Sequence, residues 1–437
     1  MKTLFEHCRI LTMDEAFTEY EDGWLLAQDG LITALGEGPF TGACDERVDG
    51  EGGILMPGMV NLHCHASMVP FRTMGDDCPD RLKRFLFPLE NEAMTPELAY
   101  LGARAGMAEM LLAGVTTFVD MYYFEDAIAR ACVEMGMRGY LGETVIGQRS
   151  PDAAGEEEGL RLCEAMLQKW RGHPLVRPIV APHGTTTVSA EGLCACHRLA
   201  EAYGTLMTLH AAEMDDEMSQ FVARGTTPIA FLRDLGCVDG RLLAAHCTHL
   251  SAEDTAILAE GGARVAHCPG SNLKAGKGVC PVRDLEAAGV TWGLGTDGPS
   301  SGNTLSLFDQ MRLCPMLQKT KYHDRSLMPA RRVVLAATRG GAEALNAGAE
   351  FGALKLGLRA DAVLVSTRRM NMFPLFNPYA ALVYGAGSAD VDTVMTGGVI
   401  RVRRGRLTQL DEDALRRDLA RAMGPFARAA QAYRDMI

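Results

Sequence analysis

Two histidines separated by one residue end an apolar segment of the sequence. Residues 54–60 are apolar or small and lead, through Asn61 and Leu62, into His63-Cys64-His65. Because side chains alternate between the two faces of a strand, His63 and His65 point to the same side. Two imidazoles that converge in this way can bind a metal ion, although an isolated pair fits two hydrogen-bonded histidines at a strand end equally well.

Further residues that can bind a metal or move a proton end other apolar segments. They are His183, His210 with Glu213, His246 and Asp297. Five of the eleven histidines therefore fall at segment ends, whereas chance or core packing would scatter them. This distribution indicates one active site. His249 and His267 also lie near segment ends, and their roles stay open.

Eight short apolar segments alternate with helix-like segments. They span residues 58–65, 115–121, 139–146, 176–183, 206–213, 242–249, 263–269 and 290–297. One intervening helix is predicted to open at Thr95-Pro96-Glu97, and another has a capping-box start at Ser251. This alternation predicts an α/β fold of the (β/α)₈ TIM-barrel type, in which the active site lies at the C-terminal strand ends.

Both ends of the chain show β-hairpin patterns. Residues 24–35 form a predicted hairpin that turns at Asp29-Gly30, and residues 392–403 form a second that turns at Gly397-Gly398. We therefore expect residues 1–57 and 354–437 to form a small β-sandwich with a C-terminal helix, beginning at about residue 411. Residues 58–353 would then form the barrel.

Composition narrows the class of partner. A formal net charge of −12 over 437 residues, without clustered lysines and arginines, argues against nucleic-acid binding. Charged residues interrupt the start of the chain, so we expect no signal peptide, and no uncharged stretch is long enough to span a membrane. The thirteen scattered cysteines are typical of a reducing, cytoplasmic environment. A homo-oligomer is left open.

Histidine and aspartate together suit a catalytic metal ion that keeps one position open for water. We predict one divalent ion bound by His63, His65, His210 and Asp297, most simply Zn²⁺, with Fe²⁺, Mn²⁺ or Ni²⁺ as alternatives. A bridged two-metal site would need a further shared anion, such as a carbamylated lysine. The segment that ends at His183 offers no lysine, so one ion is favoured.

A catalytic metal lowers the pKa of its bound water from about 15.7 to roughly 7. Glu213, three residues after His210, can accept the proton of that water and pass it to a ring nitrogen of a substrate. His246, together with Asp297, would orient the hydroxide. A helix N-cap is the alternative role of Glu213.

Several segments in order resemble the amidohydrolase superfamily. They are PGMVNLHCH, APHGTTTVS, HAAE, AAHCTHL, HCPGSNLK and LGTDGPSSGN. Over nearly its whole length the chain resembles the 5-methylthioadenosine/S-adenosylhomocysteine deaminases. The resemblance implies hydroxide attack on C6 of adenine, proton transfer by Glu213 to N1, and loss of ammonia to give an inosine-type product. It also implies that Glu90 binds the ribose hydroxyls and that His183 contacts this small-molecule purine nucleoside.

The chain departs from this family where some members use arginines to hold the homocysteine carboxylate. The corresponding regions contain Glu143 and Glu156–Glu158, although Arg149 or Arg161 are available as substitutes. We therefore rank 5'-methylthioadenosine, 5'-deoxyadenosine and adenosine ahead of S-adenosylhomocysteine. The alternatives are a deaminase of another heterocycle, of guanine, pterin or triazine type, and a non-catalytic barrel that binds a ligand. A free-base enzyme has no ribose to bind, so an exposed Glu90 turned out of the pocket would favour the first, and the presence of Glu213 argues against the second.

Overall fold

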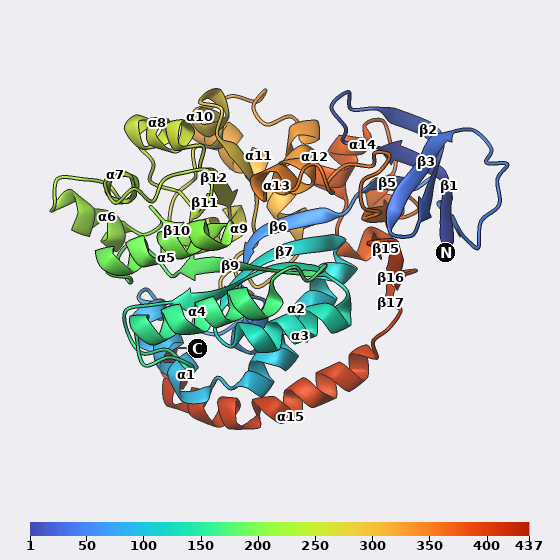
Figure 1. Cartoon of the computed structure of the whole chain (residues 1–437). Coiled ribbons are helices and arrows are strands. Elements are labelled where there is room, and N and C mark those ends of the chain that lie inside the picture. The colour runs from blue at the N-terminus through green and yellow to red at the C-terminus, as the bar shows by residue number, and fades with distance from the viewer. Residues whose placement is uncertain (437) are drawn as a thin grey trace. The chain divides into compact units, whose positions relative to one another are not determined.

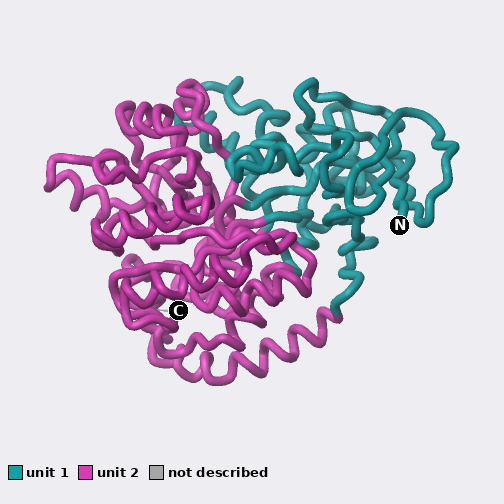
Figure 2. The backbone as a smooth tube through the Cα atoms, in the orientation of Figure 1, with its two compact units in different colours: residues 1–61, 108–117, 306–410 teal, residues 62–107, 118–305, 411–437 magenta. Residues whose placement is uncertain are grey.

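The structure is a computed structural model that describes residues 1–436. The chain divides into two compact units (Figure 2). One comprises residues 1–61, 108–117 and 306–410, and the other comprises residues 62–107, 118–305 and 411–437. None of the helices in the described residues is both long and apolar enough to cross a membrane.

An eight-stranded sheet provides the framework of the candidate site (Figure 1). Its strands are β6 (Met59–Cys64), β7 (Val115–Tyr122), β8 (Arg138–Val145), β9 (Val176–Pro182), β10 (Met207–Ala211), β11 (Leu242–His246), β12 (Arg264–His267) and β13 (Thr291–Leu294). Neighbours in the sheet are neighbours along the chain, and the pairs from β8 to β13 are parallel. All eight predicted strands are thereby confirmed. Their near-continuous apolar sequences reflect burial on both faces.

The sheet closes where the chain leaves β13. The backbone N–H groups of Thr296 and Asp297 donate to the carbonyl of His63, at 3.1 and 3.0 Å. The segment after β13 therefore runs beside the end of β6. This contact between the first and last strands gives the expected TIM-type barrel and brings Asp297 next to the histidine pair.

Helices follow the barrel strands in the predicted alternation. They include α2 (Pro96–Leu112), α3 (Glu125–Met135), α4 (Glu156–Trp170), α5 (Ala190–Tyr203), α6 (Asp215–Val222), α7 (Pro228–Asp234), α8 (Ala252–Gly261), α9 (Pro269–Lys274) and α10 (Val282–Ala287). The capping box at Ser251 is confirmed, because its hydroxyl accepts from the Asp254 N–H while the Asp254 carboxylate accepts from the Ser251 N–H. The predicted terminal helix is α15 (Glu412–Ala430), whose Phe426 packs against Phe71 with ring centroids 4.8 Å apart.

The other unit contains a mixed sheet of nine strands in the order β17-β16-β15-β14-β5-β1-β2-β3, with β4 paired to β1. These are β1 (Lys2–Leu11), β2 (Glu19–Gln28), β3 (Leu31–Glu37), β4 (Glu46–Asp49), β5 (Ile54–Pro57), β14 (Ala362–Val365), β15 (Val391–Thr396), β16 (Val399–Arg403) and β17 (Arg406–Leu407). Both predicted hairpins are present as β2–β3 and β15–β16. Their turns at Asp29-Gly30 and Gly397-Gly398 have positive φ at both central residues, as tight hairpins require.

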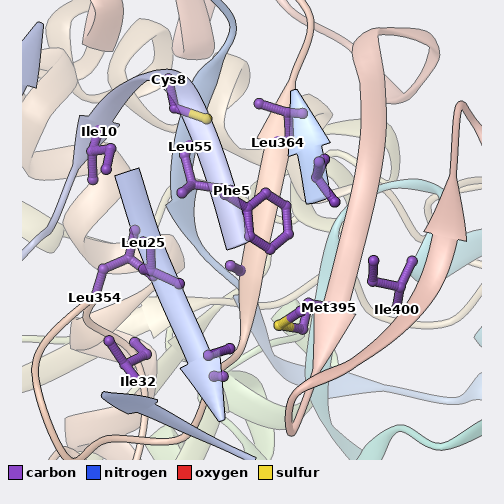
Figure 3. Packing of buried hydrophobic residues seen from close by; sticks show 14 residues of the cluster. Phe5, Cys8, Ile10, Leu25, Ile32, Leu55, Leu354, Leu364, Met395 and Ile400 are labelled. Carbon is purple, nitrogen blue, oxygen red and sulfur yellow. The ribbon is translucent and has the colours of Figure 1, made fainter. Parts of the chain in front are cut away.

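Strands from the two ends of the chain share one apolar core (Figure 3). Phe5, Ile10 and Leu25 from the N-terminal strands cluster with Leu364 and Met395 from the C-terminal strands, all nearly or completely buried. Helices α11 (Leu307–Tyr322), α12 (Ala330–Ala337) and α13 (Arg339–Ala344) belong to the same unit. The domain boundaries expected from the sequence, residues 1–57 with 354–437 and residues 58–353, stay a prediction.

Candidate active site

The predicted site residues lie at the carboxyl ends of the barrel strands, within the unit that contains residues 118–305. His63 is near the end of β6, His65 follows β6, His183 follows β9, His210 is in β10, Glu213 follows β10, His246 ends β11, Asp297 follows β13, and Glu90 is in α1 (Phe87–Ala93). Since parallel strands end on the same side of a barrel, residues far apart in the sequence meet there.

The histidine rings form one compact cluster. The ring centroid of His63 lies 4.9 Å from those of His65 and His210 and 5.3 Å from that of His246, while His183 lies 4.8 Å from His210. Three overlapping sets have ligand atoms within 4.8 Å of one another: His63 with His210 and His246, His63 with His65 and Asp297, and Glu213 with His246 and Asp297. The cluster can therefore hold a divalent metal ion, and its geometry adds His246 to the candidate ligands.

Hydrogen bonds set the orientation of three of these rings. The Nδ1 atom of His65 lies 2.5 Å from the carbonyl of Met121, that of His210 lies 2.6 Å from the carbonyl of His183, and that of His246 lies 2.9 Å from Oδ1 of Asn272. An amide carbonyl oxygen can only accept a hydrogen bond, so each Nδ1 donates. In the neutral ring the lone pair is then on Nε2, the arrangement typical of metal-binding histidines.

Asp297 completes the cluster. Its Oδ1 lies 3.2 Å from Nε2 of His65, and its Oδ2 accepts a 2.6 Å hydrogen bond from Ser271 Oγ. Burial by itself would raise the pKa of Asp297, but the hydrogen bond from His65 and the charges of His65, His246 and His63 outweigh it and lower the pKa well below the usual value. Asp297 is therefore an ionised carboxylate, as a metal ligand must be.

The electrostatics favour neutral imidazoles at most of the cluster. Burial, followed by the charges of neighbouring histidines, lowers the pKa of His63 well below 6.5. Burial also lowers the pKa of His210 well below that value, and that of His183 to about 4. His65 is the exception: burial lowers its pKa, but Asp297 and the Met121 carbonyl raise it to about 9. A positive charge is thus favoured between His65 and Asp297.

Glu213 lies beside His246 in the cluster, with its side chain 14% exposed. Its Oε1 is 3.5 Å from Nε2 of His246 and forms an ion pair with the ammonium of Lys277. Burial by itself raises the pKa of Glu213, but the charges of His246, Lys277 and His210 outweigh it and lower the pKa to about 2. The N-cap of α6 is Met214, so Glu213 does not have the capping role considered as an alternative.

Glu90 is buried, with 4% of its surface exposed. Its Oε1 accepts a 2.8 Å hydrogen bond from the Tyr122 hydroxyl, and the Tyr122 ring centroid lies 6.4 Å from that of His65. Burial raises the pKa of Glu90 to about 7, although the Tyr122 hydrogen bond and the charge of His65 lower it. The nearby Phe87 ring packs against His183 at 5.5 Å. Helix α1 therefore places Glu90 and Phe87 beside the histidine cluster.

The acidic residues expected to repel an anionic substrate group are held in other interactions. Glu143 in β8 is buried, and its Oε2 accepts from the Glu125 N–H at 3.0 Å. Burial and the neighbouring Asp152 raise the pKa of Glu143 well above its usual value, which disfavours the charged form of this side chain. The carboxylate of Glu156 accepts from the Ser189 N–H and Oγ at 2.8 and 2.7 Å. Neither interaction supports repulsion by these two residues.

The structure adds residues that sequence reasoning missed. Lys277, Ser271 and Asn272 contact Glu213, Asp297 and His246, respectively. All three belong to the segment that begins HCPGSNLK and follows β12, so the motif was visible, but its spacing did not indicate which partners these side chains contact. His249 has 26% side-chain exposure and lies 3.5 Å from Asp215. Neither His249 nor His267 belongs to a metal-binding set among the described residues.

Comparisons with known proteins agree with this geometry. The model of the amidohydrolase family matches residues 54–401. The 5-methylthioadenosine/S-adenosylhomocysteine deaminase 1 of Syntrophus aciditrophicus is 38% identical over 410 residues, which cover 92% of this chain and 93% of the relative. The corresponding deaminase of Nitratidesulfovibrio vulgaris strain DP4 is 38% identical over 428 residues, 96% of both chains.

Solved structures extend the comparison. An adenosine deaminase from Xanthomonas campestris, solved with bound zinc, is 31% identical and has a TM-score of 0.94, with 98% of each chain covered. A triazine hydrolase variant has a TM-score of 0.90 at 23% identity over 97% of this chain and 99% of that one, which shows the shared fold alone. From its family match and its curated relatives, this chain belongs to the amidohydrolase family.

Proposed function

We propose that this protein is a metal-dependent hydrolytic deaminase of adenine nucleosides, which releases ammonia and leaves an inosine-type product. The observation that carries the proposal is the convergence of the histidines and Asp297 on one point, with the carboxylate of Glu213 beside His246. The names of the deaminase relatives support the choice of substrate class.

His63, His65, His210 and Asp297 would hold the metal ion. The fit is supported by the 3.2 Å approach of His65 Nε2 to Asp297 Oδ1. With Nδ1 of His65 donating to a carbonyl, a neutral His65 would face Asp297 with a second acceptor, and this contact is favourable only with a cation or a proton between the two atoms. When bound, a divalent ion supplies Lewis acidity that makes water a nucleophile at neutral pH. Zinc is the first choice, since the Xanthomonas relative binds it.

Glu213 would carry the proton. Its carboxylate accepts a proton from the attacking water and delivers it to N1 of the adenine ring, a role that typically contributes ~10²- to 10⁴-fold to the rate. His246 and Asp297 would orient the same water, with the Asp297 carboxylate acting only as an acceptor, and keep the lone pair of the water directed at C6 of the ring. His246 is suited to this because its contact with Asn272 fixes the ring plane.

Glu90 and His183 would bind the substrate. The Tyr122 hydroxyl holds Oε1 of Glu90, and the carboxylate would accept hydrogen bonds from the ribose hydroxyls. Such donors favour the charged form of a buried carboxylate, so ribose would offset the cost of ionising Glu90. We keep 5'-methylthioadenosine, 5'-deoxyadenosine and adenosine ahead of S-adenosylhomocysteine, although the burial and raised pKa of Glu143 weaken the electrostatic reason for that order.

We further propose a cytoplasmic location. All thirteen cysteines are free thiols, and ten of them are buried in the described structure, as is usual for reducing compartments.

The test is a screen for ammonia release by the zinc-loaded protein. The substrates are the four nucleosides above, with adenine, guanine, a pterin and an aminotriazine as comparisons. We expect the nucleosides to release ammonia and to show the change in absorbance that accompanies conversion of the adenine ring to hypoxanthine. Glu213→Gln is the matched control. Release from a free base alone would overturn the nucleoside assignment, and no release from any compound would overturn the deaminase.

A further inference from the structure

Lys277 is a partly buried cation in direct contact with the proposed proton carrier. Its side chain is 16% exposed, and its ammonium forms an ion pair with Oε1 of Glu213. We infer that Lys277 is a positioning residue, which holds the Glu213 carboxylate in the orientation needed for proton transfer. This inference rests on the proposed function of Glu213.

The main chain at Glu213 is held independently of Lys277. The Glu213 N–H donates to Oε2 of Glu217 at 2.8 Å, and the Glu213 carbonyl accepts from Thr248 Oγ1 at 3.0 Å. The preceding Ala212 has φ 50°, a conformation that such contacts must maintain in a residue other than glycine. The backbone is therefore fixed, and only the side-chain torsions of Glu213 remain to be set.

Two groups contact Oε1 from different parts of the chain. Lys277 follows α9, and His246 ends β11, with its Nε2 3.5 Å from Oε1. Asn272 links the two groups, because its carbonyl accepts from the Lys277 N–H at 2.9 Å and its Oδ1 accepts from His246 Nδ1 at 2.9 Å. Asn272 therefore contacts both Lys277 and His246 and fixes the position of the ammonium relative to the imidazole.

Loss of the ammonium would leave His246 as the remaining polar contact of Oε1 in the described structure. The carboxylate would then close the 3.5 Å gap to Nε2 and turn away from the substrate. A buried ion pair adds little net stability, because desolvation of the two charges offsets their attraction. Orientation of the Glu213 carboxylate therefore explains this ion pair better than a gain in stability does. A misplacement of about 1 Å costs on the order of 10²-fold in rate.

Lys274 provides a matched control. It lies three residues earlier in the same segment and forms an ion pair with Asp76 at 2.5 Å, and both of these side chains are 27% exposed. Asp76 belongs to none of the metal-binding sets found among the described residues. Lys274→Met therefore removes a lysine ion pair from the same segment without changing Glu213.

The experiment compares Lys277→Met, Lys277→Arg, Lys274→Met, Glu213→Gln and the double variant Glu213→Gln/Lys277→Met, with the nucleoside that the screen favours. We expect Lys277→Met to lower kcat by at least about tenfold while KM changes less than about threefold. Lys277→Arg should recover much of kcat, and Lys274→Met should match wild type. Lys277→Met should cause no further loss in the Glu213→Gln background, because the two residues act as one unit. Zinc content and thermal unfolding confirm that each variant is folded and loaded.

A wild-type kcat in Lys277→Met would overturn the inference. So would a further loss in the double variant, or a loss confined to KM, which would make Lys277 a substrate contact. Crystal structures of wild type and Lys277→Met give a readout that needs no activity. Glu213 turned onto His246 in the variant supports the inference, and an unmoved carboxylate overturns it. Inactivity of the wild-type protein toward every nucleoside would overturn the proposed function separately, with the structures still deciding the role of Lys277.

Discussion

Replacing Glu90 by glutamine should stabilise the protein at pH 8 and change its stability little at pH 5. Burial raises the pKa of Glu90 from 4.5 to about 7. An acid whose pKa is higher in the folded state binds protons more tightly when folded. Its contribution to stability is therefore fully present below pH 4.5 and is lost as the pH rises through 7. Glutamine does not ionise, so it removes this loss.

The size of the effect follows from the shift in pKa. From 4.5 to about 7 is roughly 2.5 units, and each unit corresponds to 1.36 kcal/mol. Ionisation of Glu90 should then cost less than about 1 kcal/mol at pH 5 and about 3 kcal/mol at pH 8. Little discount for solvent is needed, because the side chain is only 4% exposed. The Tyr122 hydroxyl can still donate to the amide oxygen of glutamine.

Urea unfolding of the zinc-loaded proteins at several pH values between 5 and 8 measures this effect. The quantity of interest is the free energy of unfolding of Glu90→Gln minus that of wild type, in which contributions of the metal and the histidines cancel. Glu92→Gln, an exposed position on the same helix α1, is the control and should show no such trend. A difference that does not grow with pH, or a variant less stable than wild type at pH 8, would refute the reasoning.

Three further outcomes are expected. Metal analysis should find one zinc ion per chain, and its removal by a chelator should lower the thermal unfolding midpoint, because a ligand that binds the folded state stabilises it. Two tightly held ions would contradict this. Glu213→Gln should keep zinc and lose ~10²-fold or more in kcat, as measured by ammonia release, and near-normal turnover would exclude Glu213 as proton carrier. Adenosine should exceed 2'-deoxyadenosine and adenine in kcat/KM by at least about tenfold, since each hydrogen bond to charged Glu90 is worth about 1.5 to 3 kcal/mol, and Glu90→Ala should abolish the preference.

Much of the fold and of the metal cluster could be predicted because both depend on local patterns. Runs of apolar residues of strand length, separated by helical segments, indicate buried parallel strands, and parallel strands must place their carboxyl ends together. His63 and His65 follow directly from the alternation of side chains in a strand. The convergence of His210, His246 and Asp297 then needs only the barrel, without any detail of packing.

Only the tertiary structure decided which side chains contact the site residues and so set their orientation and charge. Lys277 meets Glu213 across 64 residues of sequence, and Tyr122 meets Glu90 across 32. These contacts depend on how α1 and the segment after α9 pack at the barrel end. The electrostatics of Glu143 were also beyond the sequence, because this glutamate, expected to repel anions, is buried and its pKa is raised well above the usual value. Local sequence patterns determine which elements form and where their ends lie. Burial and long-range pairing determine the charge of each site residue, because desolvation and Coulomb interactions act between groups that only the folded chain brings together.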